Sequence, residues 1–171
     1  MTGTPVLGLT AVLSEGGELA AVAIAAPDLG LFESALAGGA GVGTPAAQVD
    51  EGLAAWLAEQ NAAEQAFACV GWSIGPRALP AVQAALPRCA GRFASRAIEL
   101  EVVCEALGGA LPHRDQVLSA GAWEQRARAA AASALAEYAV DDAPTSVAGS
   151  ARAAILAWLW LRRSISSGGH A

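Results

Sequence analysis

The chain contains no lysine. All ten of its basic side chains are arginines, 16 residues are Asp or Glu, and the 171 residues carry a net charge of −6. Tight non-specific binding to nucleic acid needs a basic face that displaces counterions, so this charge disfavours nucleic acid as a partner. Arg88, Arg92 and Arg96 form the one candidate basic patch, with local pairing to carboxylates as the alternative.

The chain has few cysteines, and their spacing does not suit a disulfide-bonded fold. There are three, Cys69, Cys89 and Cys104, which is an odd number, and no Cys-x-x-Cys pair occurs. This pattern argues against a disulfide framework and against a zinc site. Cys69 lies in an apolar run, where we expect a small buried thiol.

Long apolar runs are also missing. The longest, Leu19–Pro27 and Ala153–Leu161, fall far short of the roughly 20 residues that cross a bilayer. The first residues, MTGTPVLG, carry no basic segment of the kind that opens a secretory signal. We therefore expect a soluble, cytoplasmic protein without a membrane partner.

The sequence lacks the signature of a Ser-His-Asp hydrolase and that of a phosphate-binding loop. The only histidines are His113, expected in a solvated loop, and His170 near the C-terminus, and no Gly-x-Ser-x-Gly occurs. The glycine-rich segment 38–43, GGAGVG, is not followed by Gly-Lys-Ser/Thr, so we interpret it as a flexible connector. A Ser-His-Asp hydrolase and a phosphate-binding loop are both disfavoured.

The first half of the chain predicts an antiparallel meander. Two apolar runs, Val6–Leu13 and Leu19–Ala26, are joined by Ser-Glu-Gly-Gly-Glu, whose glycines suit a hairpin turn. Leu31–Glu33 is a short third strand. A helix over Ala46–Gln60 follows, with apolar residues at helical spacing. The near-continuous apolar run Phe67–Ile74 predicts a strand covered on both faces.

The second half is mainly helical in pattern. The expected elements are a helix over Arg77–Leu86 ended by Pro87, a brief strand at Ser95–Ala97, and helices over Ile98–Leu107, Gly121–Tyr138 and Pro144 to about Arg163. On the helix that begins at Ile98, the side chains of Glu99, Glu101 and Glu105 are expected to be solvated. The order predicts one α/β domain over residues 1–163 and a flexible tail over 164–171.

Several segments share their order and spacing with one group of enzymes. They are VGWS at 70–73, LP at 79–80, VLSAGAWE at 117–124, and YAVDD at 138–142 with Thr145. Through them the chain, from about Val6 to Arg163, resembles the 3′-5′ exonucleases of the ribonuclease H-like superfamily, more narrowly the exonuclease domains related to family B DNA polymerases. The resemblance implies a mixed α/β sheet with an N-terminal antiparallel meander and flanking helices.

The resemblance also implies phosphodiester hydrolysis by two metal ions, yet most of the required carboxylates are missing. Enzymes of this kind hold Mg²⁺ or Mn²⁺ with four carboxylates. The first strand, from Val6 to Ala11, should carry Asp-x-Glu and has no acid, and Ala78 stands where Asp is expected in the second motif. Only Asp142 remains, with Tyr138 as the residue that would orient water. One carboxylate cannot hold two divalent ions.

Asp142 and Tyr138 also have an ordinary structural interpretation. Asp142 precedes Pro144 and fits the N-cap of the last helix, and Tyr138 fits a ring packed at a helix end. The pair is therefore a vestigial catalytic site or a piece of local structure.

Trp158 and Trp160 are the candidate interface residues. They lie two residues apart in AAILAWLWLRR and cannot share one helical face. An exposed Trp beside Leu is a typical anchor for a protein partner or for self-association. The alternative is a wide buried face.

Three hypotheses follow. The first is a catalytically inactive exonuclease-like domain that acts by binding a protein or nucleic-acid partner and needs no cofactor. The second is an active Mg²⁺- or Mn²⁺-dependent exonuclease in which Glu15, Glu18 or Asp28 joins Asp142 as a displaced metal ligand; the hairpin-tip residues Glu15 and Glu18 are expected to be exposed and distant instead. The third is another small α/β binding module, which the absence of a meander beside the Phe67–Ile74 strand would establish.

Overall fold

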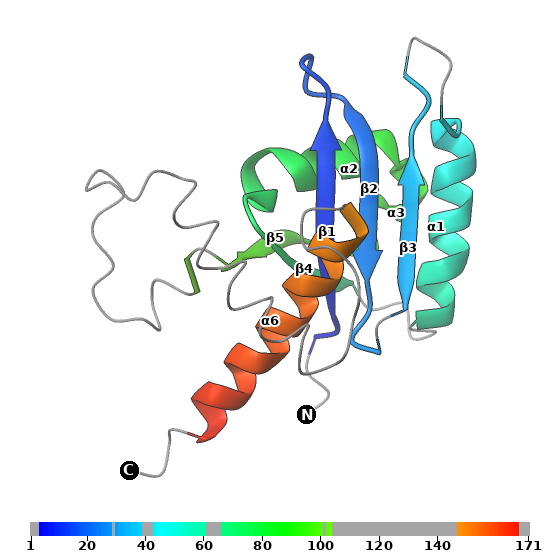
Figure 1. Cartoon of the computed structure of the whole chain (residues 1–171). Coiled ribbons are helices and arrows are strands. Elements are labelled where there is room, and N and C mark those ends of the chain that lie inside the picture. Colours follow the sequence, from blue (N-terminus) through cyan, green and yellow to red (C-terminus); the bar gives the residue numbers. More distant parts are fainter. Residues whose placement is uncertain are drawn as a thin grey trace.

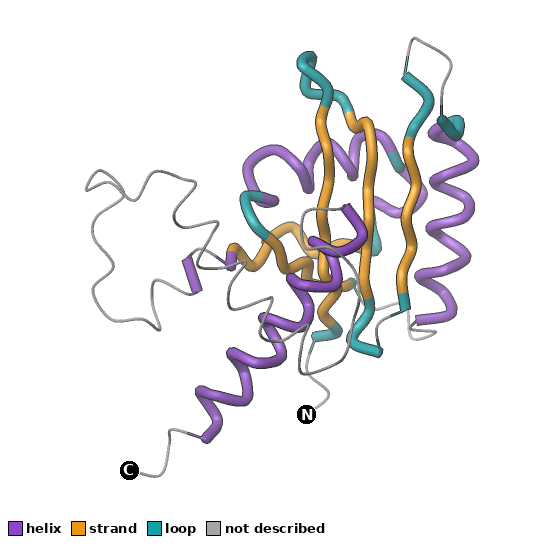
Figure 2. The backbone as a smooth tube through the Cα atoms, in the orientation of Figure 1, coloured by secondary structure: helices purple, strands orange, loops and turns teal. Residues whose placement is uncertain are grey.

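The structure, a computed structural model, describes residues 4–28, 30–38, 43–60, 66–100, 102–103 and 147–167, with the side chains of the last range described as far as residue 159. In this part of the chain a single five-stranded sheet forms the middle layer, and helices lie on both of its faces (Figures 1 and 2). The two helical layers bury the two sides of the sheet in separate apolar clusters.

Strands β1 (Val6–Leu13), β2 (Leu19–Ala25) and β3 (Leu31–Ala35) form the predicted antiparallel meander. The turn between β1 and β2 is closed by Ser14, whose amide donates to the Glu18 carbonyl and whose hydroxyl accepts from the Glu18 amide at 3.1 Å. Gly17 in this turn has a φ of 83°, a left-handed conformation that favours glycine. The hairpin inferred from the sequence is therefore confirmed.

Strand β4 (Phe67–Gly71) lies beside β1 and parallel to it, and β5 (Phe93–Glu99) lies parallel to β4 on its other side. The strand order is β3-β2-β1-β4-β5. Three antiparallel strands followed by two parallel ones give a mixed sheet of ribonuclease H-like topology. The predicted fold class is confirmed, and the meander does lie beside β4.

Helices α1 (Ala46–Gln60), α2 (Leu79–Ala85) and α3 (Pro87–Ala90) cover one face of the sheet (Figure 1). Helix α1 has the predicted bounds, and its apolar stripe is buried because it faces the strands. The larger of the two cores lies between these helices and the sheet. It includes Leu7, Leu9, Val22, Ile24, Leu53, Leu57, Phe67, Val82 and Leu86.

Helix α6 (Val147–Ser167) covers the opposite face, where it crosses β1 and β2 (Figure 1). Small side chains dominate this contact, in a cluster that includes Ala23, Ala25, Val70, Ala151, Ala154 and Ile155. The helix continues to Ser167, four residues beyond its predicted end at Arg163. The limits of the predicted domain and tail stay predictions.

The connection after β4 differs from the sequence-based expectation. The strand ends at Gly71 and not at Ile74, because Ser73 has a left-handed backbone with a φ of 53° that turns the chain. A five-residue π-helix, η1 (Ile74–Ala78), then leads into α2. Pro87, expected only to end a helix, also begins α3, since its fixed φ suits a first helical turn.

Strand β5 is longer than the brief strand predicted at Ser95–Ala97. Ile98 and Glu99, expected to open a helix, are strand residues because they pair with Val70 and Gly71 of β4. The predictions for residues 104–146 lie outside the described part of the chain. Among the described helices, none combines the length and the apolar character that a membrane span requires.

Candidate functional site

The candidate site of an exonuclease-like domain lies where β1 and β4 run side by side. Leu7 of β1 is opposite Cys69 of β4, and the two strands are parallel. At the end of β4, a side chain at Gly71 would overlap the carbonyl oxygen of Leu9. The centre of the sheet is therefore closely packed at the point where the second motif begins.

Ala78, which stands in place of the expected Asp, is buried on the side of the sheet covered by α1 and α2. It is 6% exposed and belongs to the same apolar cluster as Leu7 and Leu9. No carboxylate of β1 faces it, because β1 has none. The apolar cluster that contains Ala78 thus offers no hard oxygen ligand from a side chain.

Gly8 lies on the other face of β1, directly beneath α6. A side chain there would overlap the backbone oxygen of Ala151 and would lie 3.0 Å from the amide nitrogen of Ile155. Ala151 and Ala154 have no exposed surface. At residue 8 this face of β1 is therefore filled by the backbone and small side chains of α6, and a carboxylate side chain has no room there.

The proposed displaced ligands are not brought together. Glu15 and Glu18 are exposed at the tip of the β1–β2 hairpin, as expected, whereas Asp28 is exposed in the turn that follows β2. The seven residues of β2 separate these two ends by about 20 Å. Within the described residues, no group of three or more His, Cys, Asp or Glu could hold a metal ion. Asp142 and Tyr138 lie outside them.

Glu99 is the charged residue that sequence reasoning misplaced. It ends β5 instead of belonging to a helix, and its carboxylate accepts hydrogen bonds from the amides of Ile74, at 3.2 Å, and Gly75. Both amides open the π-helix η1, whose first N–H groups have no partner within the helix. Glu99 therefore holds the turn between β4 and α2 in place. Recognising Ile98 and Glu99 as strand residues parallel to β4 would have placed this carboxylate beside that turn.

Asp50 is a second carboxylate with a structural partner. It is 3% exposed, and its side chain accepts hydrogen bonds from the backbone amides of Arg88, at 2.9 Å, and Cys89, at 3.1 Å. The Cys89 thiol donates to the Asp50 carbonyl oxygen at 3.4 Å. A buried acid of α1 thus caps the short helix α3, which ties the two helices together.

Neither described cysteine is suited to nucleophilic chemistry. Burial raises the pKa of the Cys69 thiol from its ordinary value of 9.0 to about 12. For Cys89, burial with help from the hydrogen bond and charge of Asp50 raises the pKa to about 12, against an opposing effect of Arg92 and Arg88. Both thiols are protonated at neutral pH, and the prediction of a buried thiol at Cys69 is confirmed.

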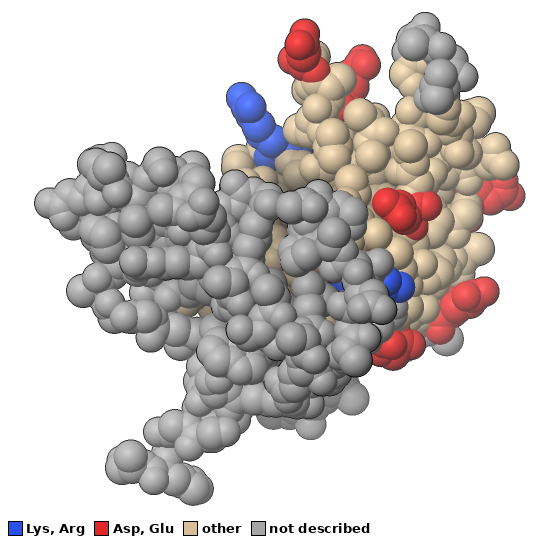
Figure 3. All heavy atoms as spheres, in the orientation of Figure 1, with Lys and Arg blue, Asp and Glu red and all other residues tan. Residues whose placement is uncertain are grey.

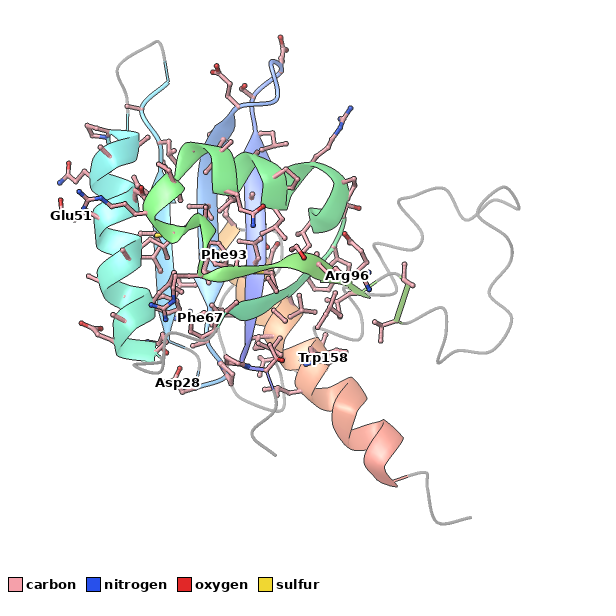
Figure 4. All side chains as sticks on the ribbon, turned by 180° about the vertical axis from the view of Figure 1, so that it is seen from behind. Asp28, Glu51, Phe67, Phe93, Arg96 and Trp158 are labelled. Atoms are coloured by element: carbon pink, nitrogen blue, oxygen red, sulfur yellow. The ribbon has the colours of Figure 1, made fainter. Side chains whose placement is uncertain are left out.

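The predicted basic patch is divided between different roles. Arg92 lies over the ring of Phe67, with its guanidinium carbon 5.6 Å from the ring centroid, and its Nη2 donates to the Leu57 carbonyl oxygen at 3.4 Å. Arg88 and Arg96 are exposed. Figure 4 shows Arg96 on β5, away from the ring of Phe67. The central arginine is therefore a packing residue and not part of a free cationic face.

A shallow, open depression of about 440 Å³ lies between the hairpin tip and helix α2. It is lined by Leu13, Ser14, Glu15, Gly16, Gly17, Arg77, Pro80 and Ala81. Arg77 and Glu15 are its only charged residues, and both are exposed. The lining provides no enclosed pocket and no group of converging polar side chains that would fix a small molecule.

Trp158 packs partly buried against the α6 cluster (Figure 4). Its indole nitrogen is buried without a hydrogen-bond acceptor among the described residues, as is that of Trp72, which follows β4. The side chain of Trp160 lies outside the described residues. The interface prediction for Trp158 and Trp160 stays a prediction.

Comparison with known proteins adds no family to this geometry. No protein-family model matches the chain, and neither a curated protein nor a solved structure shows significant similarity to it. The fold class rests on strand order and direction alone.

Proposed function

We propose that this chain is a catalytically inactive, exonuclease-like domain that acts by binding a partner, most simply another protein. The observation that carries the proposal is the lack of any acid on β1, together with the contact of Gly8 with the backbone of Ala151, which leaves no room for a side chain at residue 8. The acidic balance of the chain supports a protein over a nucleic acid as the partner.

The exonuclease-like origin rests on the sequence motifs together with the ribonuclease H-like topology. The fold alone does not assign an activity, since one topology serves many functions. The missing carboxylates separate this chain from the two-metal enzymes that it resembles, because Mg²⁺ and Mn²⁺ need several oxygen ligands at one place.

A metal titration combined with a nuclease assay tests the proposal. The chain is titrated with Mg²⁺ and Mn²⁺ by calorimetry and incubated with single-stranded DNA and RNA, beside an Asp142→Ala variant. We expect no cleavage and the same weak or absent heat for both proteins. Cleavage by the wild type that disappears in Asp142→Ala would overturn the proposal and establish the alternative, a metal-dependent exonuclease with displaced ligands.

A further inference from the structure

The hydrogen-bond pattern of β3 can be followed residue by residue. The Leu36 amide donates to the Ala20 carbonyl and the Ala26 amide donates to the Gly30 carbonyl, each at 2.8 Å. These bonds bracket the β2–β3 ladder, which has no bulge between them. Antiparallel pairs alternate between bonded and non-bonded positions, so the even-numbered residues of β3 bond to β2.

The odd-numbered residues of β3 therefore direct their amides and carbonyls away from the sheet. At Ala35 this outer edge is already used, because its carbonyl accepts from the Thr44 amide at 2.8 Å. At Leu31 and Glu33 no donor or acceptor among the described residues reaches the backbone. Within the described residues, two N–H groups and two C=O groups thus form a short, unpaired stretch of sheet edge beside the point where Thr44 closes it.

Acidic side chains outnumber basic ones around this stretch, although α6, which also contacts β3, carries Arg152. Residues 1–76 contain no Lys, Arg or His, and the first basic residue of the chain is Arg77. The exposed acids of the segment from the β2–β3 turn to the end of α1 are Asp28, Glu33, Glu51 and Glu59. Figure 3 shows several acidic side chains over β3 and α1 with a small basic area beside them, and Figure 4 places Asp28 and Glu51 on the side of the molecule opposite Arg96.

An apolar floor lies next to the same edge, on the side of α1. Phe32 of β3 and Trp56 of α1 are partly buried and meet in a tilted ring contact, with centroids 6.3 Å apart. Gly52 of α1 is exposed, and a side chain at this position would contact the edge of the Phe32 ring. Because residue 52 is glycine, that contact is absent. Residues on this face of an added strand would contact aromatic surface.

We propose that the β3 edge at Leu31–Glu33 binds an extended, basic segment of a partner protein, which continues the sheet as an added strand. The proposal rests on the proposed function as a binding domain and names the chemistry of the partner. Main-chain hydrogen bonds to Leu31 and Glu33 hold the segment, and alternate side chains determine which segment binds. Arg or Lys lies beside Glu33 on the α6 face, and an apolar residue lies beside Phe32 on the α1 face.

Charge decides between this partner and a second copy of the chain. Pairing of two β3 edges would bring Glu33 of one copy close to Glu33 of the other, on a side of the molecule where Asp28, Glu51 and Glu59 are also exposed. Like charges across neighbouring strands are destabilising, and exposed charge is a usual defence of strand edges against self-pairing. A basic segment turns the same charge into an attraction.

A short fluorescent peptide that alternates arginine and valine is the probe for binding to the full chain. We expect a rise in anisotropy that Glu33→Arg weakens by about tenfold or more, which corresponds to 1.4 kcal/mol or more. Glu18→Arg makes the same charge change at the exposed hairpin tip and should leave binding within about twofold. A peptide with N-methyl groups on one edge should not bind, because that edge can no longer donate.

Amide hydrogen exchange locates the contact. In the free protein the amides of Leu31 and Glu33 should exchange fast and those of Phe32 and Ser34 slowly, and bound peptide should slow the first pair. Equal binding to Glu33→Arg, protection of Leu31 and Glu33 in the free protein, or a wild-type dimer at neutral pH that blocks peptide binding would each overturn the proposal. If the peptide does not bind and the nuclease assay is also negative, only the edge proposal fails and the proposed function stands. Metal-dependent cleavage would overturn the proposed function whether or not the peptide binds.

Discussion

Gly8 of β1 and Ala151 of α6 are in backbone contact, so that the helix lies on the strand without an intervening side chain at this point. Ala151 has no exposed surface, and Ile155, one turn later, closes the same contact. The distance between helix and sheet is therefore set by the absence of a side chain at residue 8. Where a two-metal enzyme needs space for ions and water, this domain has a tight packing contact.

Replacing Gly8 tests this contact. We expect Gly8→Ala to lower the free energy of unfolding by about 1–3 kcal/mol, because the new methyl group overlaps the Ala151 carbonyl and α6 must move. Urea unfolding measures the change. Gly16→Ala is the matched control, since its nearest neighbour is the Ser14 hydroxyl at 3.7 Å, and it should change stability by less than about 0.5 kcal/mol. Equal effects at the two sites would contradict the packing argument.

Removing the Asp50 carboxylate should destabilise the contact between α1 and α3. Asp50→Ala leaves the buried amide of Cys89 without its acceptor, and we expect a loss of about 2–4 kcal/mol on unfolding in urea. Glu51→Ala, one residue later and exposed, provides the comparison and should stay within about 0.5 kcal/mol of the wild type. If both variants lost the same stability, capping of α3 by Asp50 would not be the cause.

The buried thiols give a test based on pH and chemical access. In a Cys104→Ser background, Cys69 and Cys89 should react with a thiol reagent at neutral pH only when urea unfolds the chain. Their pKa values rise from 9.0 to about 12 on folding, so the folded state favours the protonated thiols. Their contribution to stability is complete below pH 9 and falls as the pH rises from 9 toward 12. Rapid labelling of the native protein would show that the thiols are accessible.

Urea unfolding should also show that Glu99 stabilises the fold. Glu99→Gln removes the charge that strengthens two hydrogen bonds to the Ile74 and Gly75 amides, and we expect a loss of about 1–2 kcal/mol. Glu33→Gln makes the same change on an exposed strand residue and should be nearly neutral. Exchange of the Gly75 amide should also quicken in Glu99→Gln, which global loss of stability alone would not single out.

The elements with regular patterns were predictable and the junctions were not. The hairpin and α1 were found because alternation and helical spacing extend over many residues, and the two glycines mark the turn. The π-helix was missed because its geometry depends on Ser73 in a left-handed conformation and on Glu99, which is 25 residues away from Ile74 in sequence. A contact between residues so far apart leaves no local pattern.

In the candidate site, too, some features could be predicted from the sequence and others could not. The missing acids of β1 and Ala78 could be read from the sequence, but nothing there indicated that α6 fills the face above Gly8. Arg92 appeared to belong to a cluster of three arginines, whereas the fold stacks it on Phe67. Long-range packing therefore decided which charged residues remain available, and it also left Leu31 and Glu33 unpaired at the sheet edge.

The exposed acids beside β3 also affect how copies of this protein behave toward one another in solution. A bare strand edge is a template on which identical chains can stack, and here the surrounding carboxylates keep two such edges apart. Salt weakens that repulsion, because exposed charges are screened over about 8–10 Å at physiological ionic strength. High salt therefore removes this protection of β3, so the first aggregates to form would be sheets joined at this edge.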